Sequence, residues 1–147
     1  MLTAIDRQVA AAREGRDPYV VARMTSGWAV LGERQFLRGY ALLLADPVVP
    51  DLNALDPAQR AAFLLDLVRL GDAVLEVTGA VRINYAILGN LEPALHAHVI
   101  PRYADEPEEL RTLHPWAYDW QSAPRLDPLA SRDLIERLRR ELAPRGD

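Results

Sequence analysis

The chain contains no cysteine among its 147 residues. This absence excludes disulfide bonds and every metal site that depends on a thiolate ligand. A chain without cysteine fits a reducing compartment, and we expect the protein to act in the cytoplasm. Histidine is also scarce, with only three residues, so histidines that stand close together are an informative feature.

Lysine is missing as well, and all seventeen basic residues are arginines. The formal net charge is −4, and there is no basic tract of the kind that binds nucleic acid polymers. Long apolar runs are lacking too, since the run 40–45 is far shorter than the roughly 20 residues that span a bilayer. Charges at Asp6 and Arg7 argue against a signal peptide. We therefore expect no nucleic acid polymer and no membrane as a partner.

Hydrophobic spacing and turn residues predict a mixture of helices and strands. We expect helices at 3–14, from Asp56-Pro57 to Gly79, and after Asp127-Pro128. The predicted strands cover 19–25, 28–31, 36–45, 82–88 and 95–100. Pro101 marks the end of the last strand or a sheet edge. The expected fold class is α+β, with a mainly antiparallel sheet, one long central helix, and N- and C-terminal helices.

The most informative feature is the pair His96 and His98, which stand one residue apart in a β-prone apolar segment. Because side chains alternate along a strand, both imidazoles should leave the same face of the sheet. Two neighbouring imidazoles can hold a metal ion, or they can attack and protonate one substrate group. A nucleophilic histidine must be neutral, with one ring nitrogen bare and the other bonded to an acceptor that fixes the tautomer.

Two neighbouring segments, 84–90 (NYAILGN) and 93–102 (PALHAHVIPR), resemble the histidine triad (HIT) family. Among its members they are most similar to the bacterial diadenosine polyphosphate hydrolase-like branch. The segment 36–44 resembles the family strand that precedes its long helix. The resemblance covers roughly residues 19–103, which we take as the core of one HIT-like domain spanning 1–147. The remaining residues, 104–147, are then a C-terminal arm and helix.

The resemblance implies a hydrolase or nucleotidyl transferase that cleaves nucleotide conjugates, such as diadenosine polyphosphates or phosphoramidates, at the α-phosphate. In the family motif His-φ-His-φ-His-φ-φ, where φ is apolar, His96 matches the nucleophile that forms a nucleotidyl-histidine intermediate. His98 matches the histidine that contacts the leaving oxygen. The implied partner is a second copy of the chain, whose sheet joins the first. No cofactor is implied, although the substrate can arrive as a magnesium complex.

The chain departs from the family pattern at two places. Ala94 occupies the first triad position, where its backbone carbonyl can still accept from the nucleophile's other ring nitrogen. Tyr40 stands after Gly39, where the family usually has a histidine. The resemblance places Asn84, Asn90 and Arg102 as candidate phosphate contacts, with Asn84 the better match of the two asparagines. For Asn90 a turn role is the alternative, and for Arg102 an exposed surface position.

Other readings of the same residues stay open. A metal site would use His96 and His98 with His114 or Asp105 as a third ligand. A protein without turnover would bind nucleotides as a sensor or serve as a dimeric scaffold, and Ala94 is the feature that favours it. In the simplest alternative, both histidines are buried core residues whose ring nitrogens are hydrogen-bonded and have no role in chemistry.

Aromatic residues suggest where a base or leaving group is recognised. Trp28, Phe36 and Leu43 are candidates for a base pocket, with core packing as the favoured alternative. His114 lies in an aromatic arm at 111–122, which either forms a surface loop or folds over a site and selects the leaving group.

Overall fold

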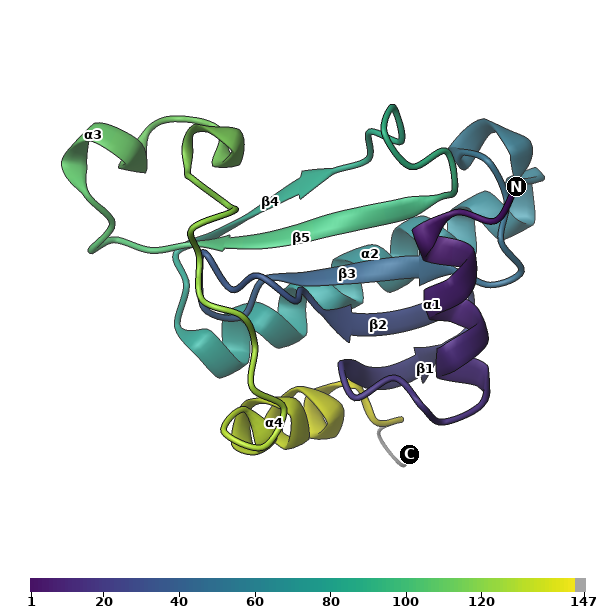
Figure 1. Ribbon diagram of the computed structural model, residues 1–147, viewed down its shortest axis with the longest axis horizontal. Coiled ribbons are helices and arrows are strands. Elements are labelled where there is room, and N and C mark those ends of the chain that lie inside the picture. Colours follow the sequence, from purple (N-terminus) through teal and green to yellow (C-terminus); the bar gives the residue numbers. More distant parts are fainter. Residues whose placement is uncertain (145–147) are drawn as a thin grey trace.

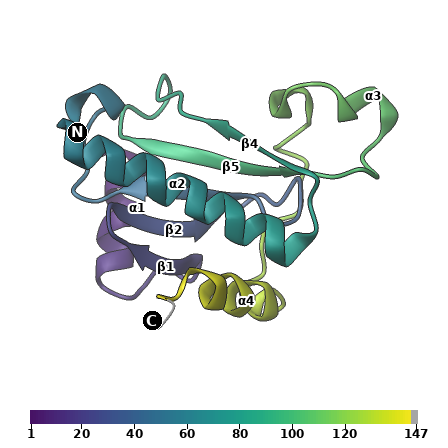
Figure 2. The same ribbon diagram turned by 180° about the vertical axis from the view of Figure 1, so that it is seen from behind.

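The computed structural model describes residues 1–144, which form a five-stranded antiparallel sheet with helices on both faces (Figures 1 and 2). The strand order is β1-β2-β3-β5-β4. The strands are β1 (Val20–Met24), β2 (Gly27–Leu31), β3 (Ala41–Ala45), β4 (Arg82–Ala86) and β5 (His96–Arg102). The helices are α1 (Ala4–Arg13), α2 (Pro57–Thr78), α3 (Glu108–Arg111) and α4 (Arg132–Leu142), with short 3-10 turns at Leu52–Ala54 and Pro115–Ala117. This arrangement confirms the predicted α+β class.

The two faces of the sheet are covered differently. Figure 2 shows α2 lying across one face, with α4 beside it under β1. This face packs the main core around Phe63, Leu70 and Leu138, which are fully buried. On the other face α1 covers one end of the strands, and the arm after β5 passes over the opposite end (Figure 1). The histidine side chains belong to this second face, so α2 supports their strand from behind.

Both ends of the long central helix α2 carry the start and stop residues that its sequence predicts. Asp56 caps α2 by accepting a hydrogen bond from the backbone N–H of Gln59, whose side chain bonds back to the N–H of Asp56. Pro57 occupies the first helical turn, where no N–H is needed. Gly79 ends the helix with φ 71°, a left-handed conformation that favours glycine.

The predicted strand over 36–45 is only half correct, because β3 begins at Ala41. Gly39 has φ 95°, which breaks an extended chain, and a Cβ on this residue would lie 2.7 Å from the methyl group of Thr78. The Gln35 side chain accepts a hydrogen bond from the N–H of Gly39. Residues 36–40 therefore form a turn that brings the Tyr40 side chain against β5.

Two further boundaries differ from the prediction. The C-terminal helix does not begin at Asp127-Pro128 but at Arg132, because Asp127 caps a preceding turn by accepting from the N–H of Leu129. Pro101 lies inside β5 rather than at its end, opposite Ile83 of β4. At this point β5 has passed its last pairing with β3, at Val99, so the missing N–H of proline interrupts no ladder on that side.

The two outer strands of the sheet differ in what lies beside their edges. Beside β1, the Arg139 side chain of α4 donates from Nε to the carbonyl of Val21 at 2.8 Å. On the opposite side, β4 is an edge strand, and its Tyr85 is partly exposed. Across residues 1–144, no helix combines the length and the apolar character needed to cross a membrane.

Candidate active site

The two histidines of β5 stand side by side on the open face of the sheet. Their ring centroids are 5.2 Å apart with the planes at 68°. His96 is opposite Leu44 of β3, and His98 is opposite Leu42 of β3 and Ala86 of β4. The alternation along the strand therefore places both imidazoles on one face, as predicted.

His96 has a defined tautomer. Its Nδ1 lies 2.7 Å from the backbone carbonyl oxygen of Ala94. A carbonyl only accepts, so Nδ1 carries the proton and donates, and the neutral ring then has a bare Nε2. Within residues 1–144 this Nε2 makes no hydrogen bond and still reaches solvent, although the residue as a whole is buried. His96 therefore presents a free lone pair, which is what a nucleophile needs.

His98 is bonded to a residue that the histidine motif does not contain. Its Nδ1 lies 2.8 Å from the hydroxyl of Tyr40, and the two rings stack with centroids 6.0 Å apart. Burial, together with the neighbouring His96, lowers the pKa of His98 to about 4. The His98 ring is therefore neutral at physiological pH and retains a single ring proton.

Aromatic side chains of the arm pack against His98 from the same chain. Trp116 meets the His98 ring edge to face, with 5.3 Å between the ring centroids, and Trp120 does so with 6.2 Å between the centroids. The two indoles stack on each other with 5.1 Å between the ring centroids, and Trp120 stacks on Phe36 with 3.7 Å between the centroids. The arm at 111–122 is therefore not a detached surface loop but one wall beside His98. Trp116 remains 42% exposed.

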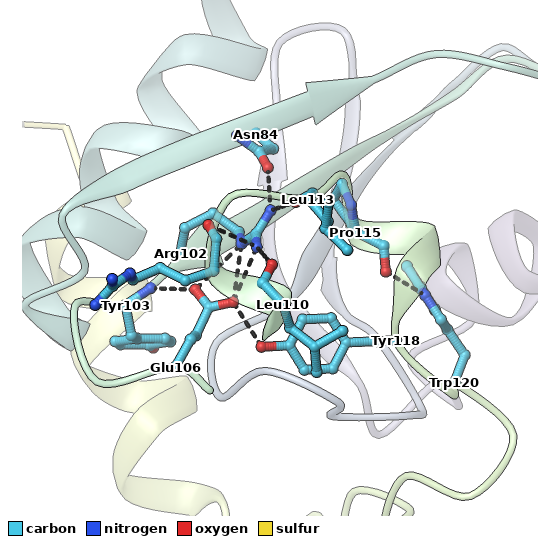
Figure 3. A network of polar contacts seen from close by, with 10 residues as sticks. Asn84, Arg102, Tyr103, Glu106, Leu110, Leu113, Pro115, Tyr118 and Trp120 are labelled. Atoms are coloured by element: carbon cyan, nitrogen blue, oxygen red, sulfur yellow. Dashed lines mark hydrogen bonds and ion pairs between the residues drawn. The ribbon is translucent and has the colours of Figure 1, made fainter. Parts of the chain in front are cut away.

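A buried ion pair fastens the arm to β5 (Figure 3). The guanidinium of Arg102 binds both carboxylate oxygens of Glu106 at 3.0–3.1 Å. It also donates to the backbone carbonyls of Leu110, Arg111 and Leu113. Glu106 accepts further hydrogen bonds from the Tyr118 hydroxyl and the Tyr103 N–H.

This network changes the interpretation of two candidate phosphate contacts. Arg102 is neither exposed nor free, because its side chain is 7% exposed and its guanidinium is committed to the arm. The alternative of an exposed surface position is therefore wrong. A phosphate contact of Arg102 stays a prediction. Asn84 accepts from Arg102 at 2.9 Å through Oδ1, which turns its amide nitrogen away from the guanidinium. Asn84 lies on the same face of the sheet as the histidines, since it pairs with Ile100.

The remaining candidates occupy ordinary structural positions. Asn90 is exposed after Gly89, which has φ 79°, so it lies in the turn that was the alternative for it. Ala94 is buried against Ile5 and Val9 of α1. Leu43 faces the α2 core.

Trp28 and Phe36 are likewise held by packing. The Trp28 indole donates to the buried Asp46 at 2.8 Å. Hydrogen bonds from Arg13 and Trp28 hold the pKa of that carboxyl down to about 2, although burial acts in the opposite direction. Phe36 stacks on Trp120, so core packing describes each member of the suggested base pocket.

The metal alternative required a third ligand near the histidine pair. His114 is exposed at the start of the 3-10 turn Pro115–Ala117. In the part of the chain that the structure describes, no three histidine, aspartate or glutamate side chains gather closely enough to hold an ion.

Sequence reasoning missed two of these contacts. The Tyr40–His98 bond joins residues 58 positions apart, and the only signal was a family position at which tyrosine replaces histidine. The Arg102–Glu106 pair has i,i+4 spacing, but it follows a strand and not a helix.

No family model and no curated protein matches the sequence. Among solved structures, 36 chains match. A histidine triad protein from Bradyrhizobium japonicum is 23% identical, with 90% of this chain and 96% of that chain covered and a TM-score of 0.71.

Two further structures give the same picture. A histidine triad protein from Marinobacter aquaeolei VT8 is 19% identical, with 97% of both chains covered and a TM-score of 0.74. A zinc-bound histidine triad family protein from Mycobacterium smegmatis is 21% identical, with 90% of this chain and 91% of that chain covered and a TM-score of 0.65. Identities at this level show the fold alone. The fold of this chain is therefore that of the histidine triad proteins.

Proposed function

We propose that the protein is a nucleotide hydrolase or nucleotidyl transferase that cleaves nucleotide conjugates at the α-phosphate. The observation that carries the proposal is the bond from His96 Nδ1 to the Ala94 carbonyl, which leaves Nε2 bare beside His98. This arrangement supplies a neutral nucleophile and a second imidazole in one place. The fold of histidine triad proteins supports the same class of chemistry.

The proposed reaction has two steps. In the first, the Nε2 lone pair of His96 attacks the α-phosphorus, and the bond to the leaving group breaks with its electron pair on the departing atom. In the second, water attacks the phosphorus, and the P–N bond breaks with its electron pair returning to Nε2. This releases the nucleoside monophosphate and one proton from the water to solvent, and it restores the neutral His96. The chain's own residues suffice for both steps, and magnesium enters only if it arrives with the substrate. The amide nitrogen of Asn84 is a proposed phosphate donor, whereas the Arg102 guanidinium already binds Glu106 and the carbonyls of the arm.

The incomplete triad is not an obstacle in this account. The side chain that Ala94 lacks is not required for the Nδ1 bond, because the acceptor is backbone. The direct test is to incubate the protein with diadenosine tetraphosphate and to measure release of AMP. Release that depends on His96 supports the enzyme. Absence of release together with tight AMP binding would instead support the nucleotide sensor.

We further propose a cytoplasmic homodimer that forms through β4 and the neighbouring surface of α2. Leu65 is 63% exposed and Val68 48% exposed on α2. The Tyr85 hydroxyl packs against Gly71, one helical turn from Val68, so the apolar surface continues onto the edge strand. An unpaired edge beside exposed apolar side chains favours association with a second copy.

Replacing Val68 with glutamate should convert the dimer into a monomer. A charge at the centre of the apolar surface would have to be desolvated without a partner in the dimer. Light scattering coupled to size-exclusion chromatography gives the molar mass directly. Leu129→Glu is the matched control, since Leu129 is 76% exposed outside this surface. A wild-type protein that is monomeric at micromolar concentration would contradict the proposed assembly.

The arm should influence the choice of leaving group. Trp116→Ala removes an exposed indole that touches His98, so we expect several-fold changes in the relative kcat/KM of substrates with different leaving groups. The free energy of unfolding of the Trp116→Ala protein should change by about 1 kcal/mol or less, because Trp116 is partly exposed. Steady-state kinetics with two substrates and urea unfolding measure both quantities. His114→Ala serves as the control, and parallel loss of all activities and of stability would contradict a selective role.

A further inference from the structure

Tyr40 is held in place on all sides. Its side chain is 5% exposed and packs in a cluster with Leu37 and Ile100. The ring meets Phe36 at 5.3 Å and Trp120 at 5.0 Å, both edge to face. The hydroxyl therefore has little freedom, and it lies 2.8 Å from His98 Nδ1.

The direction of this hydrogen bond determines what His98 can do. Burial raises the pKa of Tyr40 well above its usual range, so the phenol keeps its proton. Within residues 1–144 the hydroxyl has no other side-chain partner. If Nδ1 donated to the phenol oxygen, the buried phenol proton would lack an acceptor, which is unfavourable. The phenol therefore donates to Nδ1, and the single proton of the neutral His98 ring is on Nε2.

We propose that Tyr40 is a positioning residue that holds His98 as the neutral Nε2–H tautomer, so that the site cleaves conjugates whose leaving group departs as an oxygen anion in preference to phosphoramidates. This inference rests on the proposed function. The two histidines then have opposite tautomers: His96 offers a bare Nε2, and His98 offers an Nε2–H donor. One attacks the phosphorus while the other stabilises charge on the leaving atom.

The selectivity follows from what a neutral imidazole can deliver. When His96 displaces a phosphate or carboxylate, the P–O bond breaks and its electron pair stays on the leaving oxygen. That oxygen is stable as an anion, and a hydrogen bond from His98 Nε2–H is sufficient. The proton remains on His98 throughout, so no further acid is consumed.

A phosphoramidate places a heavier demand on the same group. Its leaving amine cannot depart as an anion and must gain a proton as the P–N bond breaks. His98 could supply that proton only as a cation, or by taking the Tyr40 proton on Nδ1 while giving up its own. The aromatic and hydrogen-bonding neighbours of the His98 ring are His96, Tyr40, Trp116 and Trp120. Within residues 1–144 no carboxylate forms an ion pair with His98 that would stabilise the cation. Buried phenolate is equally unfavourable, as the raised pKa of Tyr40 indicates.

The tautomer can be measured without any substrate. Two-bond proton–nitrogen correlation spectra of the ¹⁵N-labelled protein at pH 7 distinguish the protonated from the bare nitrogen of each ring. We expect protonated Nε2 on His98 and protonated Nδ1 on His96. In Tyr40→Phe, which removes only the hydroxyl, His98 should become a mixture of tautomers. Tyr103→Phe is the control, because it removes a hydroxyl that bonds a backbone carbonyl instead of a histidine. Protonated Nδ1 on wild-type His98, or an unchanged tautomer in Tyr40→Phe, would overturn the positioning role.

Kinetics test the leaving-group preference. Wild-type kcat/KM should be higher for diadenosine tetraphosphate than for adenosine 5′-phosphoramidate by about 100-fold or more, the usual size of a general-acid contribution. Tyr40→Phe should lower kcat for the anhydride by about tenfold, the value of one hydrogen bond, while KM changes little. Equal or faster cleavage of the phosphoramidate by the wild type would overturn the preference. Turnover of neither substrate would overturn the proposed function and the preference with it, while the spectra would still decide the role of Tyr40.

Discussion

His96→Ala should abolish AMP release from diadenosine tetraphosphate, with a loss of roughly 10³-fold or more in kcat. The reason is that the proposed first step uses the bare Nε2 of His96, and the only adjacent imidazole, His98, has its Nδ1 occupied by Tyr40. Steady-state assays of AMP formation measure the effect.

The fold should survive this substitution. Within residues 1–144 the His96 side chain makes one hydrogen bond, to a backbone carbonyl, and β5 keeps its pairing with β3 and β4. Circular dichroism and the elution volume of the variant should therefore match the wild type. His114→Ala, which changes the third histidine, should leave turnover intact. Activity retained in His96→Ala would show that another group attacks the phosphorus.

Arg102→Met should destabilise the protein strongly, with a loss of about 3–5 kcal/mol in the free energy of unfolding at pH 7. The substitution leaves the Glu106 carboxylate, whose side chain is 3% exposed, without its cationic partner. It also removes the donors that hold the carbonyls of Leu110 and Leu113. Urea unfolding followed by tryptophan fluorescence measures the loss.

The pH dependence of this effect has a defined sign. Burial alone would raise the pKa of Glu106, but hydrogen bonds from Arg102, Tyr118 and the Tyr103 N–H hold it below its ordinary value of 4.5. A carboxyl with a lowered pKa in the folded state stabilises the fold above its unfolded pKa. That stabilisation is lost as the pH falls through the folded value. The difference between wild type and Arg102→Met should therefore be full at pH 7 and shrink below about pH 4.5.

The exposed ion pair between Arg125 and Glu33 provides a matched control. Its N–O distance is 2.6 Å, but the side chains are 66% and 47% exposed. Arg125→Met should therefore cost less than about 1 kcal/mol. If the free energy of unfolding falls no more in Arg102→Met than in Arg125→Met, Arg102 does not hold the arm on β5.

Local signals were enough to predict most elements of the fold. The cap at Asp56 and the stop at Gly79 mark α2 correctly, because both act within a few residues of the helix ends. The predicted strand over 36–45 is wrong before Ala41, because nothing in its apolar pattern reveals the positive φ of Gly39. Because glycine has no Cβ, this turn can also pack tightly against Thr78, which is distant in sequence.

The candidate site was predictable only in part. The placement of His96 and His98 on one face depends on the period of a strand, which sequence reveals directly. The position of Arg102 depends on Glu106 and on carbonyls of a folded arm, and an arginine after a strand carries no signal of that partner. Tyr40 is similar, since its role exists only once the turn at 36–40 meets β5. Contacts between distant segments are the part that the sequence leaves open.

The most direct test of the central claim is intact-protein mass spectrometry after rapid mixing with diadenosine tetraphosphate, followed by peptide mapping of the modified protein. The covalent mechanism predicts one added adenylyl group on His96. The group should be absent in His96→Ala and present in His98→Ala, where the leaving group is assisted less. AMP formation without any adenylyl group on His96, or with the group on a different residue, would contradict the covalent mechanism.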